Sequence, residues 1–293
     1  MGQATFRRIL CPIDFSVGSE RALEHAMAWA AREGSSLELL HVLEPPDFTR
    51  GELWTLYLEF EKSLLRKVED QMEASVRMAR VRVPGATGRV IQGRRAAEIL
   101  AHAGGSGADL VVIGTSGIGA LRGILGSVAD RMLRTSRSPV LLVPSQGRPV
   151  SAVPKHIVAA TDFSAPSKAG VTRSIALGRE LGASVEVVHA YELPRIADPG
   201  GHVAIGLRTA MTAEIHEEHP DLAEGRARAH EGPAAATIVS LADESKADLI
   251  TIASSGRGLV SKWLLGSVTD RVVRMTDVPV LVWRPEPERP AIA

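Results

Sequence analysis

Short apolar segments alternate with amphipathic segments along the chain. The apolar segments are apolar throughout, which is typical of strands buried on both faces of a parallel sheet. The segments between them carry apolar residues at spacings of three and four, the pattern of amphipathic helices. Strands alternating with helices predict an α/β fold with helices on both faces of the sheet. In the first half the expected strands are 8–13, 37–43, 88–91, 110–114 and 140–143, and the expected helices are 16–32, 52–80, 95–102 and 126–134.

The second half of the chain repeats the first. ILCPIDFSVGSERAL, which begins at Ile9, returns as IVAATDFSAPSKAGV, and LVVIGTSGIGALRGILGSVADRM returns as LITIASSGRGLVSKWLLGSVTDRV. This repeat predicts two domains, at 1–145 and 154–285, joined by a linker at 146–153 that is rich in Pro, Ser and Gly. Apolar periodicity is weaker in the middle of the second half, so we expect the helix there to be shorter or partly disordered. The proline-rich tail at 286–293 is predicted to be disordered.

Composition and charge exclude several classes of partner. The chain has 34 Lys and Arg against 34 Asp and Glu, and aromatic residues make up 4% of it. A neutral chain with few rings has neither a basic face for phosphate backbones nor a platform for stacked bases, so no nucleic-acid partner is expected. No apolar run reaches the roughly 18 residues that span a bilayer, and the start lacks an apolar signal segment, so no membrane partner is expected. The single cysteine, Cys11, indicates a reducing compartment and a cytoplasmic protein.

Each half has a glycine-bearing loop between a buried strand and a helix that begins with Gly-Ser-Val. In the first half the strand ends at Gly114, the loop contains Gly117, and the helix begins at Gly126. Ligands bind at the carboxyl ends of strands in an open parallel sheet, and backbone N–H groups at a helix start attract anions. The loop therefore suits a phosphate group. Glycine is expected because a side chain would forbid left-handed backbone or block the phosphate oxygens.

The same helix start has a structural explanation. Ser127-x-x-Asp130 and Ser267-x-x-Asp270 both match the capping box, in which a serine and an acidic residue satisfy the first N–H groups of a helix. The two roles are compatible, because the serine hydroxyl can turn toward a phosphate when one is present.

An aspartate ends the first strand of each half. Asp14 and Asp162 come just before Ser16 and Ser164, which we expect to be helix N-caps. A carboxylate there can accept a hydrogen bond from an adenine amino group or a ribose hydroxyl, or it can simply stabilise the following helix start. Recurrence in both halves favours a shared site. No P-loop or dinucleotide fingerprint occurs, so P-loop hydrolysis and hydride transfer are not supported.

In these segments the chain resembles the universal stress protein family in its tandem two-domain form. The resemblance runs from Phe6 to Trp283 and includes CPIDFS, LLHVLEP, ADLVVIGTSG, the GSV helix start and SPVLLVP. It implies two doubly wound, mainly parallel five-stranded sheets of the Rossmann-like, adenine nucleotide alpha hydrolase-like type. These domains would form a pseudo-dimer with strands 140–143 and 280–282 at the two-fold interface. A homodimer of the whole chain is a further expectation.

The resemblance also implies a ligand, ATP or another adenine nucleotide, with or without Mg²⁺. Nucleotide-binding members of the family look like G-x-x-G, nine residues, then G-[ST]. The first half has only eight residues between Gly117 and Gly126, and the second half has Ala253 in place of the first glycine. A deletion can be absorbed within a loop, and an alanine is harmful only where the backbone needs positive φ or tight contact. The implied nucleotide contacts are Pro12, Ile13, Asp14, Val42, Ile113, Gly114, Ser116, Gly117, Gly126, Ser127 and Val128 in the first half, and Ala160, Thr161, Asp162, Ala190, Ile252, Ala253, Ser255, Gly256, Gly266, Ser267 and Val268 in the second.

The function expected from this resemblance is stress-response signalling, in which the nucleotide is a regulatory ligand with little or no hydrolysis and the protein partner is unknown. No serine or cysteine has a repeated histidine partner, so no catalytic residue is predicted. One alternative is a nucleotide-independent interaction module with degenerate loops. Another is a slow ATPase, with Asp14 or Asp130 holding Mg²⁺ through water, although nothing positions an attacking group. His216-Glu-Glu-His219 lacks a third ligand and is expected to be solvated, so no metal site is predicted.

Overall fold

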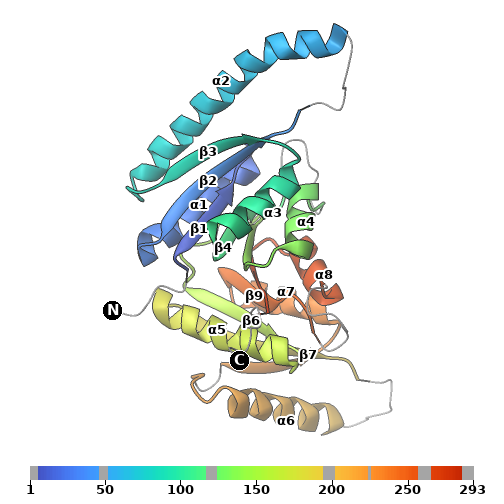
Figure 1. The fold of residues 1–293 in the computed structure, drawn as a ribbon. Helices are drawn as coiled ribbons and strands as arrows, with labels where there is room; N and C mark the ends of the chain where they lie inside the picture. The colour runs from blue at the N-terminus through green and yellow to red at the C-terminus, as the bar shows by residue number, and fades with distance from the viewer. Residues whose placement is uncertain are drawn as a thin grey trace, which may run out of the picture.

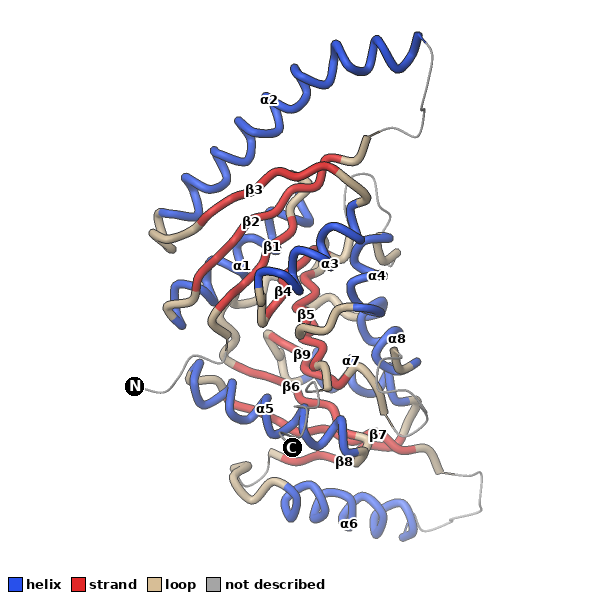
Figure 2. Tube along the Cα trace, in the orientation of Figure 1, coloured by secondary structure: helices blue, strands red, loops and turns tan. Residues whose placement is uncertain are grey.

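The structure, a computed structural model, describes residues 6–45, 52–116, 124–193, 202–223, 226–256 and 265–285. These residues form one ten-stranded β-sheet with helices packed on both of its faces (Figure 1). Figure 2 shows the strands as a continuous central layer that runs through both halves of the chain. The tail at 286–293, predicted to be disordered, lies outside the described residues.

Helices and strands follow the predicted order in both halves. The long amphipathic segment of the first half is a helix, α2, and its counterpart α6 is shorter, as the weaker periodicity predicts. Domain 1 comprises β1 (Arg8–Pro12), α1 (Val17–Glu33), β2 (Ser36–Leu43), α2 (Glu52–Arg80), β3 (Thr87–Gln92), α3 (Arg95–Ser106), β4 (Leu110–Gly114), α4 (Ser127–Thr135) and β5 (Val140–Val143). Domain 2 comprises β6 (His156–Thr161), α5 (Ala165–Leu181), β7 (Ser184–Tyr191), α6 (His202–Glu218), β8 (Ala227–Glu231), α7 (Ala234–Glu244), β9 (Leu249–Ala253), α8 (Ser267–Met275) and β10 (Val280–Trp283).

The strand order is β3-β2-β1-β4-β5-β10-β9-β6-β7-β8. Neighbouring strands are parallel within each domain, and only the β5–β10 pair that joins the domains is antiparallel. From β1 the chain winds to one side through β2 and β3, and then crosses to the other side at β4. The carboxyl ends of β1 and β4 therefore form a topological switch point, where ligands bind in sheets of this kind. The strands β6 and β9 form the equivalent point in domain 2.

Two layers of apolar side chains cover the two faces of the sheet. One layer joins strand residues such as Ile9 to α1, α2, α5 and α6, and the other joins residues such as Leu10 to α3, α4, α7 and α8. Successive residues of a strand point to opposite faces, so a strand covered on both faces is apolar at every position. This arrangement confirms the expected parallel sheet between helical layers. Within the part of the chain that the structure describes, no helix is both long and apolar enough to cross a bilayer.

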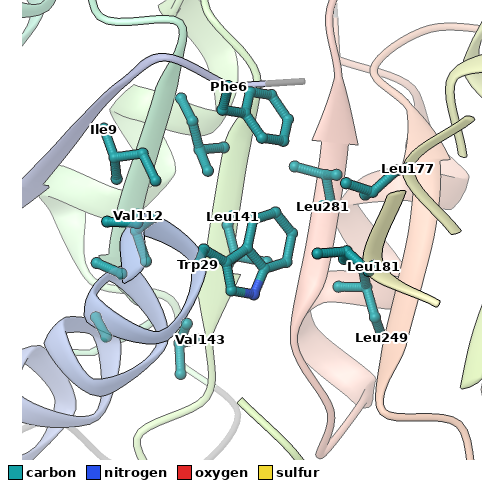
Figure 3. Close-up of a cluster of buried hydrophobic side chains, with 14 of the residues drawn as sticks. Phe6, Ile9, Trp29, Val112, Leu141, Val143, Leu177, Leu181, Leu249 and Leu281 are labelled. Atoms are coloured by element: carbon teal, nitrogen blue, oxygen red, sulfur yellow. The ribbon is translucent and has the colours of Figure 1, made fainter. Parts of the chain in front are cut away.

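The two domains join edge to edge along β5 and β10. Leu141 and Leu281 are paired at the centre of this contact, and both are fully buried. Phe6 stacks on Trp29 of domain 1 and on Trp283 of domain 2, with ring centroids 5.9 and 5.8 Å apart. Figure 3 shows Trp29 and Leu141 of domain 1 next to Leu281 of domain 2 at this joint, with Phe6 beside them. The last strands of the two halves therefore form the predicted pseudo-two-fold interface.

Candidate functional site

A cavity opens at the switch point of each domain. The cavity of domain 1 lies at the carboxyl ends of β1, β2 and β4, beside the start of α4, and has a volume of about 410 Å³. The cavity of domain 2 occupies the equivalent place beside α8, with a volume of about 540 Å³. Small-molecule sites in proteins usually have volumes of roughly 300–1,000 Å³. Both cavities are therefore large enough for a ligand of nucleotide size.

The structure brings the predicted site residues together in both domains, because they stand at the ends of adjacent strands and at the start of the next helix. Gly117 lies outside the described residues. The other predicted residues line the cavities: Pro12, Ile13, Asp14, Val42, Ile113, Gly114, Ser116, Gly126, Ser127 and Val128 in domain 1, and Ala160, Thr161, Asp162, Ala190, Ile252, Ala253, Ser255, Gly256, Gly266, Ser267 and Val268 in domain 2.

The two aspartates belong to the same hydrogen-bonded loop in each domain. Oδ1 of Asp14 accepts the backbone N–H of Ser16 at 3.1 Å and its hydroxyl at 2.5 Å. Oδ1 of Asp162 accepts the same two bonds from Ser164, also at 3.1 and 2.5 Å. Ser16 and Ser164 are the N-caps of α1 and α5, as predicted. The structural role of the aspartates is therefore confirmed, and it leaves both carboxylates in the cavity walls, where a ligand can contact them.

Sequence reasoning missed a strained residue next to each aspartate. Phe15 and Phe163 have φ of 61° and 60°, in the left-handed region that such residues rarely adopt. Their rings pack on His41 and His189, with centroids 4.8 and 4.5 Å apart. Nδ1 of each histidine donates to the carbonyl just before the aspartate at 2.8 Å, and burial lowers the pKa of His41. Strain of this kind clusters at functional sites, and the repeated Asp-Phe-Ser was its signal in the sequence.

Helix packing explains the first glycine of the domain 1 loop. A Cβ on Gly114 would lie 2.7 Å from the carbonyl oxygen of Gly18 at the start of α1. That oxygen is part of the backbone, so a side chain could enter only if the helix moved. In domain 2 a Cβ on Gly170 would lie 3.7 Å from the Cβ of Ala253, which is an ordinary contact. Packing against α1 therefore requires a glycine at position 114, and Ala253 reflects a change in helix packing. The expectation that Gly114 also makes room for a phosphate stays a prediction.

The helix starts differ from the predicted capping box. Gly126 and Gly266 are the N-caps of α4 and α8, and Ser127 and Ser267 are the first helical residues. The φ angles of the two glycines are −61° and −70°, which any residue can adopt, so the expected left-handed backbone is absent at both. Neither helix has a side-chain cap among the described residues. The capping-box prediction is wrong, and uncapped N–H groups at a helix start attract anions.

The loop glycine of domain 2 packs against its aspartate. A Cβ on Gly256 would lie 2.2 Å from Oδ2 of Asp162. Because Ser164 holds Oδ1 of the same carboxylate with two hydrogen bonds, the side chain could move away only by breaking them. Gly256 is therefore required to keep Asp162 in the cavity wall.

Comparison with known proteins agrees with this architecture. The family model described as "Universal stress protein family" matches residues 5–144 and 154–284. The chain belongs to the universal stress protein family. A universal stress protein of Mycolicibacterium smegmatis is 28% identical over 297 residues, which cover 96% of this chain and 98% of that protein. One from Thermus aquaticus is 38% identical over 142 residues, which cover 47% of this chain and 98% of its own length. The chain is thus a tandem, two-domain member.

A solved structure shares this tandem fold. The crystal structure of a universal stress protein from Archaeoglobus fulgidus has a TM-score of 0.66 to this chain and covers 94% of it and 98% of its own chain, at 20% sequence identity. Identity at this level indicates a common fold.

In this universal stress protein, four charged residues join the two domains beside the cavities, where α4 and α8 lie side by side (Figures 1 and 2). Nε of Arg134 lies 2.9 Å from Asp130, and Nη2 lies 3.3 Å from Asp270. Arg274 makes the mirrored contacts, at 3.1 Å to Asp270 and 3.0 Å to Asp130. The hydrogen bond from Arg134 holds the pKa of Asp130 below its ordinary value. We call these four residues the interdomain ion-pair cluster.

Sequence reasoning missed this cluster, and assigned Asp130 and Asp270 to helix capping instead. A signal was present, because each half has an aspartate followed four positions later by an arginine. That spacing predicts a pair within one helix. It does not predict the contact between helices, which exists only because β5 and β10 bring α4 and α8 together.

The cavity of domain 1 has an arginine of its own at the start of α3. Arg95 lines this cavity, and its Nε lies 3.3 Å from a carboxylate oxygen of Glu44, which also lines it. Ala234 lines the cavity of domain 2 at the start of α7. The two domains therefore differ in the charge that this helix brings to the ligand site.

Two further reactive side chains of the described residues, His219 and Cys11, are buried. No group of three or more His, Cys, Asp and Glu side chains in the described part of the chain could hold a metal ion. His219 is 6% exposed and burial lowers its pKa, so the expected solvated position is wrong for this histidine. Burial raises the pKa of the Cys11 thiol to about 12, which makes the thiol unreactive at neutral pH.

Proposed function

We propose that this universal stress protein binds an adenine nucleotide, with ATP as the first candidate, in the cavities of both domains. The observation that carries the proposal is the repeated construction of the cavity. At each switch point an uncapped helix start and an aspartate line the same cavity, with apolar residues between them. A helix start suits phosphate groups, and a carboxylate can accept hydrogen bonds from a ribose or an adenine amino group.

The walls suggest how the nucleotide would lie. The phosphates would meet the starts of α4 and α8, at Gly126 and Gly266. The base and ribose would contact Asp14 or Asp162, and apolar side chains such as Ile113 line the space for a base. Family resemblance, described above, favours adenine. We infer a cytoplasmic protein that uses the nucleotide as a regulatory ligand in stress-response signalling.

Hydrolysis is expected to be slow or absent. Phosphoryl transfer to water needs a residue that orients the attacking water and a metal that bridges the phosphates. Among the described residues, no group of three or more His, Cys, Asp and Glu side chains could hold that metal. Regulation then requires that the nucleotide bind one conformation of the protein, or of its complex with a partner, more tightly than another.

Titration calorimetry with Mg-ATP tests this proposal, using one variant for each domain. Ser127→Glu and Ser267→Glu each place a negative charge at an exposed first position of a helix. A glutamate there favours the helix, so both variants are expected to fold, while its charge repels a phosphate. Ser127→Gln and Ser267→Gln are matched neutral controls.

The expected result is two bound nucleotides per chain for the wild type and for both glutamine controls, and one for each glutamate variant. No binding to the wild type at millimolar Mg-ATP would contradict the proposal and favour an interaction module that acts without nucleotide. Release of several equivalents of ADP per minute would instead favour an ATPase. Native mass spectrometry of the same samples reports whether two whole chains form a homodimer.

A further inference from the structure

The cavity of domain 2 is lined by an arginine that belongs to domain 1. Arg134 lies in α4, and its side chain reaches the cavity beside Gly266 and Ser267 at the start of α8. Its counterpart in domain 2, Arg274, is absent from the residues that line the cavity of domain 1 within the described part of the chain. The pseudo-symmetry of the two domains is therefore broken at the helix start where an anion would bind.

The guanidinium of Arg134 has bonding capacity left after its ion pairs. Nε and Nη2 contact Asp130 at 2.9 and 3.2 Å, and Nη2 also contacts Asp270 at 3.3 Å. Nη1 has no partner among the described residues. The contact with Asp270 is the longest of the contacts that join the cluster, and the side chain is 48% exposed. A ligand anion could therefore bind Nη1 of Arg134 while the bond from Nε to Asp130 stays intact.

A buried hydroxyl without a partner lines the same cavity. Ser255 is 5% exposed, and its Oγ forms no hydrogen bond with the described residues. At the equivalent position in domain 1, the hydroxyl of Ser116 is hydrogen-bonded to that of Ser145. Pro285 occupies the position of Ser145 in domain 2 and has no hydroxyl to offer. Buried polar groups are nearly always hydrogen-bonded. A ligand in this cavity that bonds to Oγ of Ser255 would satisfy that rule.

Asp270 also lines this cavity, and its carboxylate opposes an anion. Arg274 neutralises it, with Nε 3.1 Å from Oδ2. The cation that an anionic ligand can recruit is thus Arg134, while Arg274 stays with the aspartates.

We propose that Arg134 is a ligand-binding residue of domain 2, supplied by domain 1, which holds the phosphate group of the nucleotide together with Ser255 and the start of α8. This rests on the proposed function and adds its regulation. A ligand in domain 2 exchanges the contact between Arg134 and Asp270 for a contact between Arg134 and phosphate, so it changes how the two domains are tied together. Within the described part of the chain, no residue of domain 2 lines the cavity of domain 1.

The test compares Arg134→Gln with Arg274→Gln, both in the Ser127→Glu chain, so that domain 2 alone can bind. Each variant removes one arginine of the interdomain ion-pair cluster, and only Arg134 lines the cavity. Titration with Mg-ATP is expected to show about tenfold weaker binding for Arg134→Gln and less than about threefold for Arg274→Gln, because charge-assisted contacts to phosphate are the strong ones. Adenosine, which has no phosphate, is expected to bind both variants equally.

Equal losses in the two variants, or no loss in Arg134→Gln, would overturn the inference. An equal loss of ATP and adenosine binding in Arg134→Gln would overturn it as well, because it would show a change in fold. If wild type binds Mg-ATP but the Ser127→Glu chain does not, domain 2 does not bind nucleotide. This inference then fails, and the proposed function holds for domain 1 alone. If wild type itself does not bind, the proposed function fails with it. Thermal unfolding of the two variants checks that their stabilities match.

Discussion

The two domains have the same cavity and complete it with different groups. In domain 1, Ser116 is hydrogen-bonded to Ser145, and the cavity has its own arginine, Arg95. In domain 2 the hydroxyl of Ser255 has no partner among the described residues, and the arginine that lines the cavity, Arg134, comes from domain 1. The comparison shows that duplication kept the frame of the site, namely the strand ends, aspartate and helix start. The groups around that frame diverged, which gives the two sites different dependence on the domain interface.

The strand end and the helix beneath it pack differently in the two domains. Domain 1 needs Gly114 because the carbonyl of Gly18 leaves no room for a Cβ there. In domain 2, Ala253 faces Gly170 of α5, and their contact is an ordinary one. In both, Asp14 and Asp162 keep identical hydrogen bonds to the helix start. The geometry of the aspartate loop is therefore more constrained than the contact between strand and helix beneath it.

The largest expected difference between the two domains is a loss of nucleotide binding by domain 2 in Gly256→Val. The new side chain would overlap Oδ2 of Asp162, where even a Cβ lies at 2.2 Å, and would push the carboxylate from its place. Loss of a hydrogen bond to a charged group costs roughly 1.5–3 kcal/mol, so nucleotide binding by domain 2 is expected to weaken by about tenfold to a hundredfold. Titration of the Ser127→Glu chain with Mg-ATP measures it.

Gly206→Val in α6 is the control for that experiment. Its Cβ would meet no atom within 4 Å, and Gly206 is not among the described residues that line the cavity of domain 2, so unchanged binding is expected. Unchanged binding in Gly256→Val would show that Asp162 is not a ligand contact.

Gly114→Ala gives domain 1 the residue of domain 2 and separates packing from ligand binding. Overpacking against the carbonyl of Gly18 is expected to cost about 1–3 kcal/mol in free energy of unfolding. The reverse change, Ala253→Gly, is expected to cost no more than about 1 kcal/mol. Urea unfolding followed by circular dichroism measures both. A Gly114→Ala chain that keeps its stability but loses nucleotide would show that the glycine serves the ligand after all.

The last prediction concerns the loss of stability at low pH, to which a buried histidine of domain 1 contributes. His25 is 6% exposed, and burial, with Arg21 second, lowers its pKa to about 4. Domain 2 has Arg173 there, which donates to the carbonyl of Arg284 at 2.9 Å. Because His25 is protonated more readily in the unfolded chain, its neutral burial stabilises the fold above pH 6.5, and this stabilisation is lost as the pH falls toward about 4.

Wild type is therefore expected to lose about 1–2 kcal/mol more than His25→Gln in free energy of unfolding between pH 7 and pH 5. Urea unfolding at the two pH values gives this difference, in which the other histidines cancel. Identical losses in the two proteins would contradict the assigned pKa of His25.

Much of the fold could be predicted because its signals are local or repeated. The alternation of apolar and amphipathic segments gave the strands and helices, and the repeat gave the two domains. The pairing of their last strands was implied by the resemblance to the universal stress protein family. The positions of Asp14 and Asp162 followed from the rule that ligands bind at strand ends. Every described residue of the predicted site lines a cavity.

The errors concern contacts that depend on tertiary geometry. The capping box was wrong because the N–H of Gly126 donates to the carbonyl of Thr115 at 2.8 Å, and this loop closure makes the glycine the N-cap. The packing role of Gly114 was missed because the approach of α1 is not visible in the sequence. The role of Arg134 depends on the contact between α4 and α8 of the two domains. The sequence pattern of either half alone does not predict that contact.

The central claim is that both cavities hold adenine nucleotide, and native mass spectrometry of the gently purified wild-type chain tests it most directly. Native mass spectra are recorded of the chain as purified and after incubation with millimolar Mg-ATP. Bound small molecules are then released and identified. After incubation, the account predicts mass additions of two adenine nucleotides per chain, and of one in Ser127→Glu or Ser267→Glu. A chain that remains bare after incubation would contradict it.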